Sequence, residues 1–240
     1  MANGIYAAAA GLAAQQTRID AIANDLANSD TTGYKTERVG FEDLLYGAEG
    51  GTAVGSGSAA IDLGPAMQEG SLEASDNPIA VAINGPGFIQ ARASDGSTTL
   101  TRNGDLQIDA SGLLVTYDGS QLVPPIKLPA GTTAADLTIG PNGAVSAHGK
   151  AVGQITIVNV AAPSGLQAAG SSSYVTTTAS GGATPSTGST LEQGKLEGSN
   201  VDVAQAMSSL LDAQQNYSLL SHAITTQDQL LQMANQMRQT

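Results

Sequence analysis

Both ends of the chain carry the same seven-residue apolar repeat. The N-terminal repeat consists of Ile5, Leu12, Ile19 and Leu26. The C-terminal repeat consists of Val203, Leu210, Tyr217, Ile224 and Leu231. An apolar residue at every seventh position describes a helix that buries a narrow seam against other helices. We therefore predict that the two ends pair while the middle of the chain projects, a layout more typical of a building block than of an enzyme.

The repeats predict one helix over residues 3–28 and a second from about Val201 to about 238. The first is rich in Ala, the strongest helix former. The second follows Asn200, a favourable N-cap residue, and has Asp202 in its first turn. Because an Ala- and Gln-rich helix of this length is only marginally stable alone, we expect the termini of a free subunit to be mobile until assembly orders them.

The polar faces of these helices are unusual. A solitary surface helix places charged residues opposite its apolar stripe, whereas these helices offer mostly Gln, Asn and Ser. Neutral side chains can hydrogen-bond between close-packed helices without the desolvation cost of an ion. This composition favours helices surrounded by other helices, from the same chain and from copies of it. A simple two-helix hairpin with one face in water is the alternative.

The middle of the chain, residues 79–178, predicts a β-rich domain. Short apolar runs alternate with pairs such as Asp95-Gly96, Asn103-Gly104 and Asp118-Gly119, which tolerate the positive φ of tight hairpin turns. This spacing is typical of an antiparallel meander or a small barrel.

The stretches on either side of this domain read as linkers. Residues 47–60 are rich in Gly, Ala and Ser and predict a flexible linker, within a longer linker or extended segment over 47–78. A second loose stretch is expected over 179–190, within a linker over 179–196. The expected fold class is thus α+β: terminal helices within 1–46 and 197–240 pack as a coiled-coil-like core, and a central, mainly antiparallel β domain lies outside it.

Composition excludes several classes of function. A net charge of −12 argues against a nucleic-acid partner, which needs clustered Lys and Arg. The absence of Cys excludes disulfides and thiol chemistry. No run approaches the roughly 18 apolar residues of a membrane span, and the first residues lack the basic start of a cleaved signal peptide. We expect no membrane insertion, and an export route other than the usual signal if the chain leaves the cell.

Enzymatic motifs are not found. His148 and His222 lack spaced partners for a zinc site, and no Gly-x-Ser-x-Gly elbow is present. The segment Gly85-Pro86-Gly87 lies between predicted strands with no helix after it, which argues against dinucleotide binding. We expect no catalytic residues, cofactor or metal.

Several segments together resemble the bacterial flagellar rod and hook family. The N-terminal signature runs from Leu12 to Tyr46, with Asn24-x-Leu26-Ala27-Asn28 and Thr32-Gly33-Tyr34-Lys35 at its centre. The block from Glu197 to Asp202 is similar to the family's other terminal block, and Val81–Phe88 and Thr101–Gly104 resemble its β domain. The resemblance covers nearly the whole chain and is strongest to the distal rod proteins, with proximal rod proteins second. The segment after Tyr46 is shorter than is typical of distal rod proteins, which leaves the subtype open.

The resemblance implies a structural subunit of the flagellar basal-body rod. Such a subunit polymerises through its terminal helices into a hollow axial drive shaft that transmits torque and passes exported subunits. The implied partners are copies of itself, other rod and hook proteins, surrounding ring proteins and the flagellar export apparatus, a type III secretion system. The implied location is the basal body outside the cytoplasmic membrane, which is periplasmic where an outer membrane exists.

The signature residues allow two interpretations. In the first, they form an assembly contact; in the second, they only end the helix and turn the chain. The residues are Asn24, Leu26, Asn28, Gly33 and Tyr34. Lys35 and Arg38 form the only close basic pair near a terminus, and for each a solvated charge is the simpler reading. Tyr217 lies on the heptad seam and is expected in the core. The full expected assembly interface comprises Ile5, Leu12, Ile19, Leu26, Asn24, Asn28, Gly33, Tyr34, Asn200, Val203, Leu210, Tyr217, Ile224 and Leu231.

Three alternatives belong to other classes or subtypes. The first alternative is a proximal rod or hook-type subunit of the same axial structure. The second is a secreted β-rich adhesin or binding module on a helical stalk, with a ligand surface on residues 79–160. The third is a hydrolase that uses scattered Asp and Ser, which requires a pocket with converging titratable groups.

Overall fold

The computed structural model describes residues 2–47, 53–186 and 188–237, and these form two compact units. Unit 1 combines residues 1–27, 37–63 and 202–240, so far as they are described. Unit 2 combines residues 28–36 and 64–201. The chain therefore crosses between the units four times, after residues 27, 36, 63 and 201.

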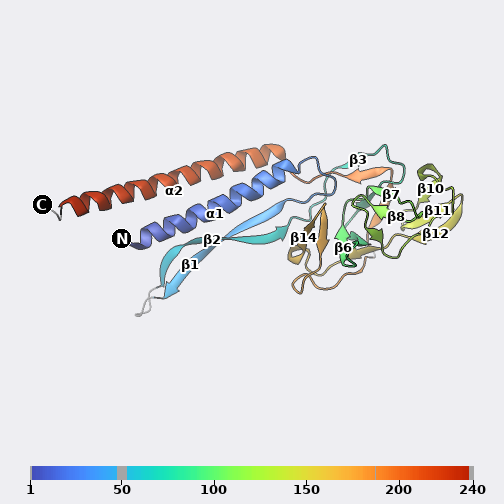
Figure 1. Cartoon of the computed structure of the whole chain (residues 1–240), viewed down its shortest axis with the longest axis horizontal. Helices are drawn as coiled ribbons and strands as arrows, with labels where there is room; N and C mark the ends of the chain where they lie inside the picture. The colour runs from blue at the N-terminus through green and yellow to red at the C-terminus, as the bar shows by residue number, and fades with distance from the viewer. Residues whose placement is uncertain (1, 48–52, 187, 238–240) are drawn as a thin grey trace. The chain divides into compact units, whose positions relative to one another are not determined.

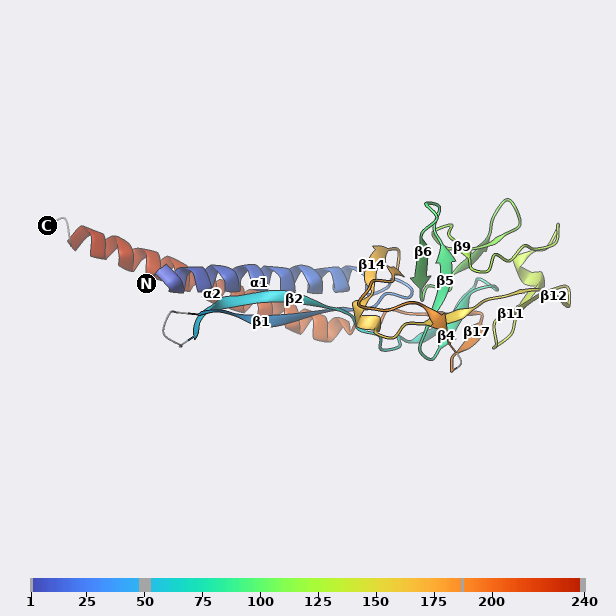
Figure 2. The same ribbon diagram turned by 90° about the horizontal axis from the view of Figure 1, so that it is seen from below.

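Unit 1 contains two helices, α1 (Ala2–Ala27) and α2 (Val203–Met237), and a β hairpin of β1 (Glu37–Gly47) and β2 (Ala53–Pro65). The helices lie side by side and antiparallel, and β1 packs along α1 (Figures 1 and 2). Small residues allow the close approach: Ala14 of α1 and Ala213 of α2 are almost fully buried. The pairing of the two ends of the chain is thus confirmed.

The start of α2 differs from the predicted one. The helix begins at Val203, and Asp202 caps it, because the Gln205 backbone N–H donates to Asp202 Oδ1 at 3.1 Å. The prediction of Asn200 as N-cap is wrong, since its side chain bonds elsewhere.

The hairpin was not expected. The flexible linker predicted over 47–60 contains strand β2 from Ala53 onward, and residues 48–52 lie outside the described residues. Gly, Ala and Ser are poor strand formers alone, but pairing with β1 and small residues at the packed face permit an extended strand here. A compositional signal for a linker therefore overlooked a paired strand.

Unit 2 is built from antiparallel strands, as predicted. Its largest sheet has the order β14-β15-β6-β5-β9-β8-β7, and β5 also pairs with β13, which pairs with β16. A second sheet has the order β10-β11-β12, and the pairs β17-β4 and β18-β3 complete the unit. The strands are β3 (Leu72–Ala74), β4 (Val81–Asn84), β5 (Phe88–Arg92), β6 (Thr98–Thr101), β7 (Leu106–Ile108), β8 (Leu114–Thr116), β9 (Gln121–Leu122), β10 (Leu137–Ile139), β11 (Ala144–Ala147), β12 (Lys150–Gln154), β13 (Ile157–Asn159), β14 (Gln167–Gly170), β15 (Ser173–Val175), β16 (Thr184–Pro185), β17 (Thr190–Gln193) and β18 (Lys195–Glu197).

An aliphatic core holds these strands together. Val81, Ile83, Leu106 and Leu114 are fully buried within it. A smaller cluster surrounds Phe88, whose ring meets that of Tyr174 edge to face at 6.0 Å between centroids. With so few aromatic residues, the core depends on branched aliphatic side chains between thin layers.

The turns follow the predicted pairs with one exception. Gly96 and Gly119 adopt positive φ in hairpin turns, as expected. Gly104 does not. Glycine is required at position 104 for another reason. The Val81 N–H donates to the Gly104 carbonyl, and this hydrogen bond brings the two backbones close together. A Cβ on residue 104 would lie 1.6 Å from the carbonyl oxygen of Val81.

The linker predicted over 179–196 is also wrong. β17 pairs with β4 along its whole length, and its Leu191 belongs to the aliphatic core. β18 pairs with β3. The segment TLEQGKLE has only two apolar residues, Leu191 and Leu196, and it follows a Gly- and Thr-rich stretch, so its sequence gives little sign of the strand that covers β4.

Candidate assembly site

Most of the predicted seam residues whose side chains the structure describes are only half-buried. Leu12, Ile19 and Leu26 of α1 are half-buried, as are Leu210 and Ile224 of α2. Val203 and Tyr217 are exposed, with 42% and 38% of their surface accessible, so the expectation of Tyr217 as a core residue is wrong for the single subunit. The side chains of Ile5 and Leu231 lie outside the described residues.

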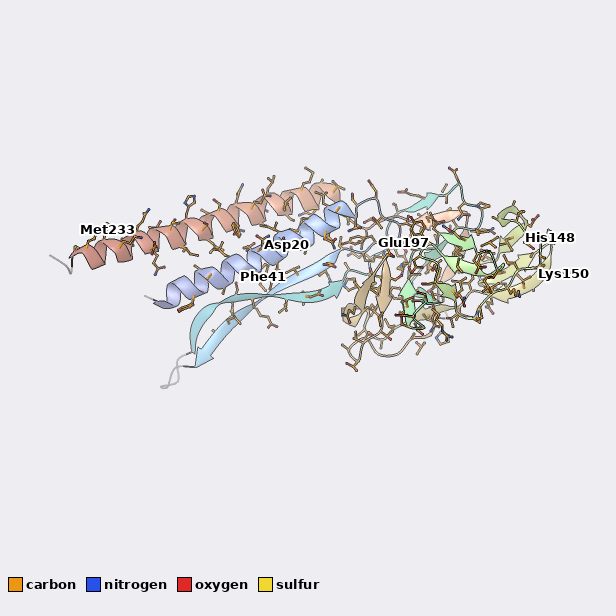
Figure 3. All side chains as sticks on the ribbon, in the orientation of Figure 1. Asp20, Phe41, His148, Lys150, Glu197 and Met233 are labelled. Atoms are coloured by element: carbon orange, nitrogen blue, oxygen red, sulfur yellow. The ribbon has the colours of Figure 1, made fainter. Side chains whose placement is uncertain are left out.

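Helix α2 also exposes apolar residues on faces other than this seam. Met207 and Leu211 are more than half exposed, and Leu219 is 66% exposed. Met233, labelled in Figure 3 near the end of α2, continues the series. Single exposed apolar residues are ordinary, but a series along one helix indicates surface for another protein element. We call Met207, Leu211, Leu219, Leu230, Met233 and Met237 the outer apolar residues of α2.

The hairpin exposes a second group of apolar side chains. Phe41, Leu44, Leu45 and Leu63 are each more than 40% exposed. Phe41 also receives the guanidinium of Arg18 from α1, 6.0 Å from its ring centroid, a cation–π contact that links hairpin and helix (Figure 3).

Carboxylates gather where the hairpin meets α1. A cavity of about 300 Å³ is lined by Asp20 and Asn24 of α1 and by Glu37 and Asp62 of the hairpin, among others. The backbone N–H of Glu37 donates to the buried carboxylate of Asp25 at 3.1 Å. Partial burial, together with the charges of Asp25 and Asp62, raises the pKa of Glu37. Ionised Glu37 therefore opposes the contact between hairpin and helix.

The signature residues separate into two groups. Asn24 is exposed on α1. Asn28 follows the last residue of α1 and forms a turn, in which its carbonyl accepts from the Thr31 N–H at 3.1 Å and its side chain accepts from the Thr31 hydroxyl. Asn28 lies within unit 2, as do Gly33, Tyr34 and Asn200, and Gly33 is buried there.

A buried ion cluster lies within unit 2, and no pattern in the sequence predicted it. The Glu197 carboxylate, labelled in Figure 3, accepts from Lys35 Nζ at 2.6 Å through one oxygen and from Arg102 Nε at 2.6 Å through the other. The side chains of all three are at most 2% exposed. Lys35 is therefore not the solvated charge that was predicted.

Every group of the cluster has further partners. Lys35 Nζ also donates to the Gln68 carbonyl at 2.6 Å, and the Gly70 N–H donates to Glu197 Oε1 at 3.0 Å. Arg102 donates to the carbonyls of Gly87, Ile83 and Gly85. Buried charges are tolerated when they are paired and hydrogen-bonded in this way.

The surroundings of the cluster shift two pKa values. Burial alone would raise the pKa of Glu197, but the charge of Arg102 and the hydrogen bonds from Lys35 and Arg102 outweigh it, so the pKa lies below its usual value. Burial lowers the pKa of Lys35, against the opposing effect of Glu197. The carboxylate of Glu197 is thus held ionised by its neighbours.

Only weak signals in the sequence could have pointed to this cluster. Lys35, Arg102 and Glu197 each stand in one of the three segments that resemble the flagellar family. Composition gave no reason to pair them, because Lys35 and Glu197 are 162 positions apart.

The two histidines lie on the surface of the described structure. His148 and His222 are both exposed, and His148 Nδ1 lies 3.8 Å from Asp136. No group of three or more His, Asp or Glu among the described residues is placed to hold a metal ion. Neither described helix carries a stretch long and apolar enough to cross a bilayer.

Comparison with known families agrees with these features. Residues 5–35 match the family described as "Flagella basal body rod protein". Residues 82–147 match "Flagellar hook protein FlgE/F/G D1 domain", and residues 192–237 match "Flagellar basal body rod FlgEFG protein C-terminal".

Individual proteins are similar over their full length. The flagellar basal-body rod protein FlgG of Buchnera aphidicola (Schizaphis graminum) is 34% identical over 262 aligned residues, which cover 99% of this chain and 100% of that protein. FlgG of Agrobacterium fabrum is 38% identical, covering 93% and 94%. FlgG of Caulobacter vibrioides is 34% identical, covering 98% and 99%. Alignments longer than this 240-residue chain mean that these relatives contain residues that it lacks. The full-length similarity and the three matched segments show that the chain belongs to the FlgG family of flagellar basal-body rod proteins.

Proposed function

We propose that this chain is a structural subunit of the distal rod of the bacterial flagellar basal body. It polymerises with copies of itself into a hollow axial shaft that transmits torque and passes exported subunits. The full-length similarity to proteins named as flagellar basal-body rod proteins supports this proposal. The paired terminal helices supply the element that such a polymer needs.

One observation carries the assembly mechanism. α2 is half-buried against α1 on its seam and yet presents the outer apolar residues on its other faces. A helix with a single neighbour gains nothing from apolar residues on its outer faces, and they become favourable only when further copies cover them. We propose that α1, α2 and the hairpin together form the contact between subunits, with coiled-coil-like packing along the seams.

The roles of the predicted interface residues follow from their positions. Nine of them would contribute through the helix pair: Ile5, Leu12, Ile19, Leu26, Val203, Leu210, Tyr217, Ile224 and Leu231. Asn24, which lines the cavity between α1 and the hairpin, would contribute on that side of α1. Gly33, Tyr34 and Asn200 would act inside the subunit, and Asn28 would end α1.

The proposal extends to partners and location. The shaft would join other rod proteins at one end and hook proteins at the other, with ring proteins around it. The flagellar export apparatus would deliver the subunit to a site outside the cytoplasmic membrane, which is the periplasm where an outer membrane exists. This function involves no catalysis.

The test combines one surface variant with electron microscopy. Leu211 is 59% exposed, so Leu211→Glu should leave the free subunit folded. The charge would be buried in the assembled shaft, where desolvation opposes it. We expect the intact chain to form tubular polymers at high concentration and to appear in the rod of isolated basal bodies, and the variant to do neither.

Tyr117→Glu, which places the same charge at an apolar residue of unit 2 that is 63% exposed, is the matched control and should assemble nearly as well as the intact chain. An intact chain that stays monomeric and is missing from isolated basal bodies would contradict the proposal. Normal assembly of Leu211→Glu would contradict the role of α2.

A further inference from the structure

Asn200 lies where three crossings of the chain come together inside unit 2. Its Oδ1 accepts from the Thr36 backbone N–H at 2.9 Å. Its Nδ2 donates to the carbonyls of Ala66 at 2.9 Å and Gln68 at 3.1 Å. The side-chain amide of one residue thereby joins three segments that are far apart in the sequence.

Each of these segments borders a crossing between the two units. Thr36 precedes the crossing into β1, Ala66 follows the return from β2, and Asn200 precedes the start of α2. Backbone hydrogen bonds reinforce the contact: the Ala66 N–H donates to the Thr36 carbonyl at 2.8 Å, and the Gly33 N–H donates to the Glu197 carbonyl at 2.8 Å. The segment 28–36, which follows α1, is held by the same set of bonds.

The ion cluster fixes the same segments from the interior. Glu197 lies three positions before Asn200, and it binds Lys35 and the N–H of Gly70. Lys35 in turn donates to the Gln68 carbonyl, which Asn200 also binds. Two side chains of the block Glu197–Asp202 thus hold both the segment after α1 and the segment after the hairpin.

We propose that Asn200, supported by Glu197, is a positioning residue for assembly. It fixes the points at which α1, the hairpin and α2 leave unit 2, so that these elements are neighbours before any subunit contact forms. This inference rests on the proposed function, since it concerns elements proposed to carry assembly.

The physical reason is the entropy of loop closure. Thr36 and Asn200 are 164 positions apart, and bringing the ends of so long a loop together would oppose helix pairing. When the folded unit 2 holds both ends, pairing becomes a local event with a high effective concentration. Helices that are marginal alone can then be released and re-formed without losing their register.

The chemistry of the amide defines the sharpest variant. Asn200→Asp keeps the shape but replaces the two Nδ2–H donors by an oxygen facing the carbonyls of Ala66 and Gln68, so two bonds become repulsions. Asn84→Asp is the matched control: Asn84 also lies in unit 2, and its Nδ2 donates to Glu192 in an exposed position.

The experiment has two arms on the full-length chain. Hydrogen exchange of the free subunit, read by mass spectrometry, measures protection of residues 28–36 and 64–70 against that of β4–β6. Quantification of the subunit in isolated basal bodies, from cells in which the variant is the only copy, measures assembly. We expect Asn200→Asp to lose at least tenfold in protection of the two segments, to retain protection of β4–β6, and to assemble at least tenfold less than the intact chain and Asn84→Asp.

The outcomes separate this inference from the proposed function. Unchanged protection of the two segments, or lost protection with normal assembly, overturns the role of Asn200. If Asn200→Asp unfolds all of unit 2, Asn200→Ala replaces it, because Ala removes the bonds without adding repulsion; global unfolding of both variants also overturns a local positioning role. If the intact chain is missing from basal bodies, the proposed function fails, whatever the exchange arm shows.

Discussion

At the residue scale, the molecule depends on a few polar groups that are completely satisfied. The Glu197 carboxylate accepts hydrogen bonds from two cationic side chains and a backbone N–H. The side-chain amide of Asn200 accepts one backbone hydrogen bond and donates two, and so joins three segments. Such groups stabilise a fold less through their net energy than through the penalty of leaving any partner unpaired.

Removing the charge of Glu197 tests that penalty. Glu197→Gln leaves Lys35 and Arg102 buried with only the half-exposed Glu69, 4.0 Å from Arg102, as a counter-charge. We expect it to lower the free energy of unfolding of unit 2 by about 3–5 kcal/mol. Urea unfolding followed by far-UV circular dichroism measures this. Glu192→Gln, which removes an exposed partner of Lys195, should cause no measurable change, and equal effects of the two would refute the special role of the buried carboxylate.

The same variant defines a pH dependence. Because the folded-state pKa of Glu197 is depressed, its contribution to stability is present above the unfolded pKa of about 4.3 and is lost as the pH falls through the folded pKa. The intact chain should therefore lose stability in acid, whereas Glu197→Gln should lose distinctly less over the same range. Parallel pH profiles for the two proteins would contradict this assignment.

Gly33 is a second residue at which the local geometry is decisive. Its φ is +69°, and a Cβ there would lie 2.7 Å from the backbone nitrogen of Asn103. Gly119 also has positive φ, but no atom lies within 4 Å of its added Cβ. Gly119→Ala should therefore cost only the backbone strain of about 1–2 kcal/mol, and Gly33→Ala clearly more. Chemical unfolding of both variants measures the loss of unfolding free energy. An equal loss in the two would show that the backbone of Asn103 moves to accommodate the added Cβ.

At the scale of elements, the hairpin and α1 meet at a site with unfavourable charges. Asp20, Glu37 and Asp62 line the cavity there. Burial, and after it the charges of Asp25 and Asp62, raise the pKa of Glu37. The cation–π contact of Arg18 with Phe41 and the apolar packing of the hairpin oppose the charge repulsion.

Neutralising Glu37 should strengthen this contact. A carboxyl group with a raised folded pKa stabilises the fold below its unfolded pKa, and this stabilisation is lost as the pH rises through the folded pKa. We expect Glu37→Gln to raise the melting temperature of unit 1 at pH 7, measured by circular dichroism at 222 nm, and to have little effect near pH 4. Glu42→Gln, an exposed change on the same strand, is the control, and a destabilised Glu37→Gln at pH 7 would show that the charge is favourable.

At the scale of the whole molecule, the two units differ in what holds them together. Unit 2 has an aliphatic core of fully buried side chains and a satisfied ion cluster. Unit 1 has few fully buried side chains among its described residues and many exposed apolar ones. We therefore expect unit 2 to be stable alone and unit 1 to gain stability from neighbouring subunits.

This difference predicts unequal local stability in the free subunit. Elements with few buried contacts open with low free energy, so amides of α1 and α2 should exchange at least about tenfold faster than those of β4–β6. Hydrogen exchange of dilute subunit against assembled polymer measures this, and the helices should become protected on assembly. Helices already fully protected in the dilute subunit would contradict the idea that assembly orders them.

The sequence by itself determined the elements whose signals are local. The heptad repeats located both helices to within a residue or two, and the apolar runs between Gly-containing turns located about half of the strands of unit 2. The motifs also identified the family. Each of these signals depends on neighbouring residues only, through propensity, periodicity and turn geometry.

Only the tertiary structure decided which distant segments meet. β17 and β18 lie in a sequence that reads as a linker, and they are strands because β4 and β3 supply the missing hydrogen bonds. Lys35 is buried because Glu197 is placed beside it, and Asn200 joins three segments instead of capping a helix. The reason is physical: the energy of a buried ion or amide depends on partners that the fold brings together from far along the chain, and no local pattern encodes them.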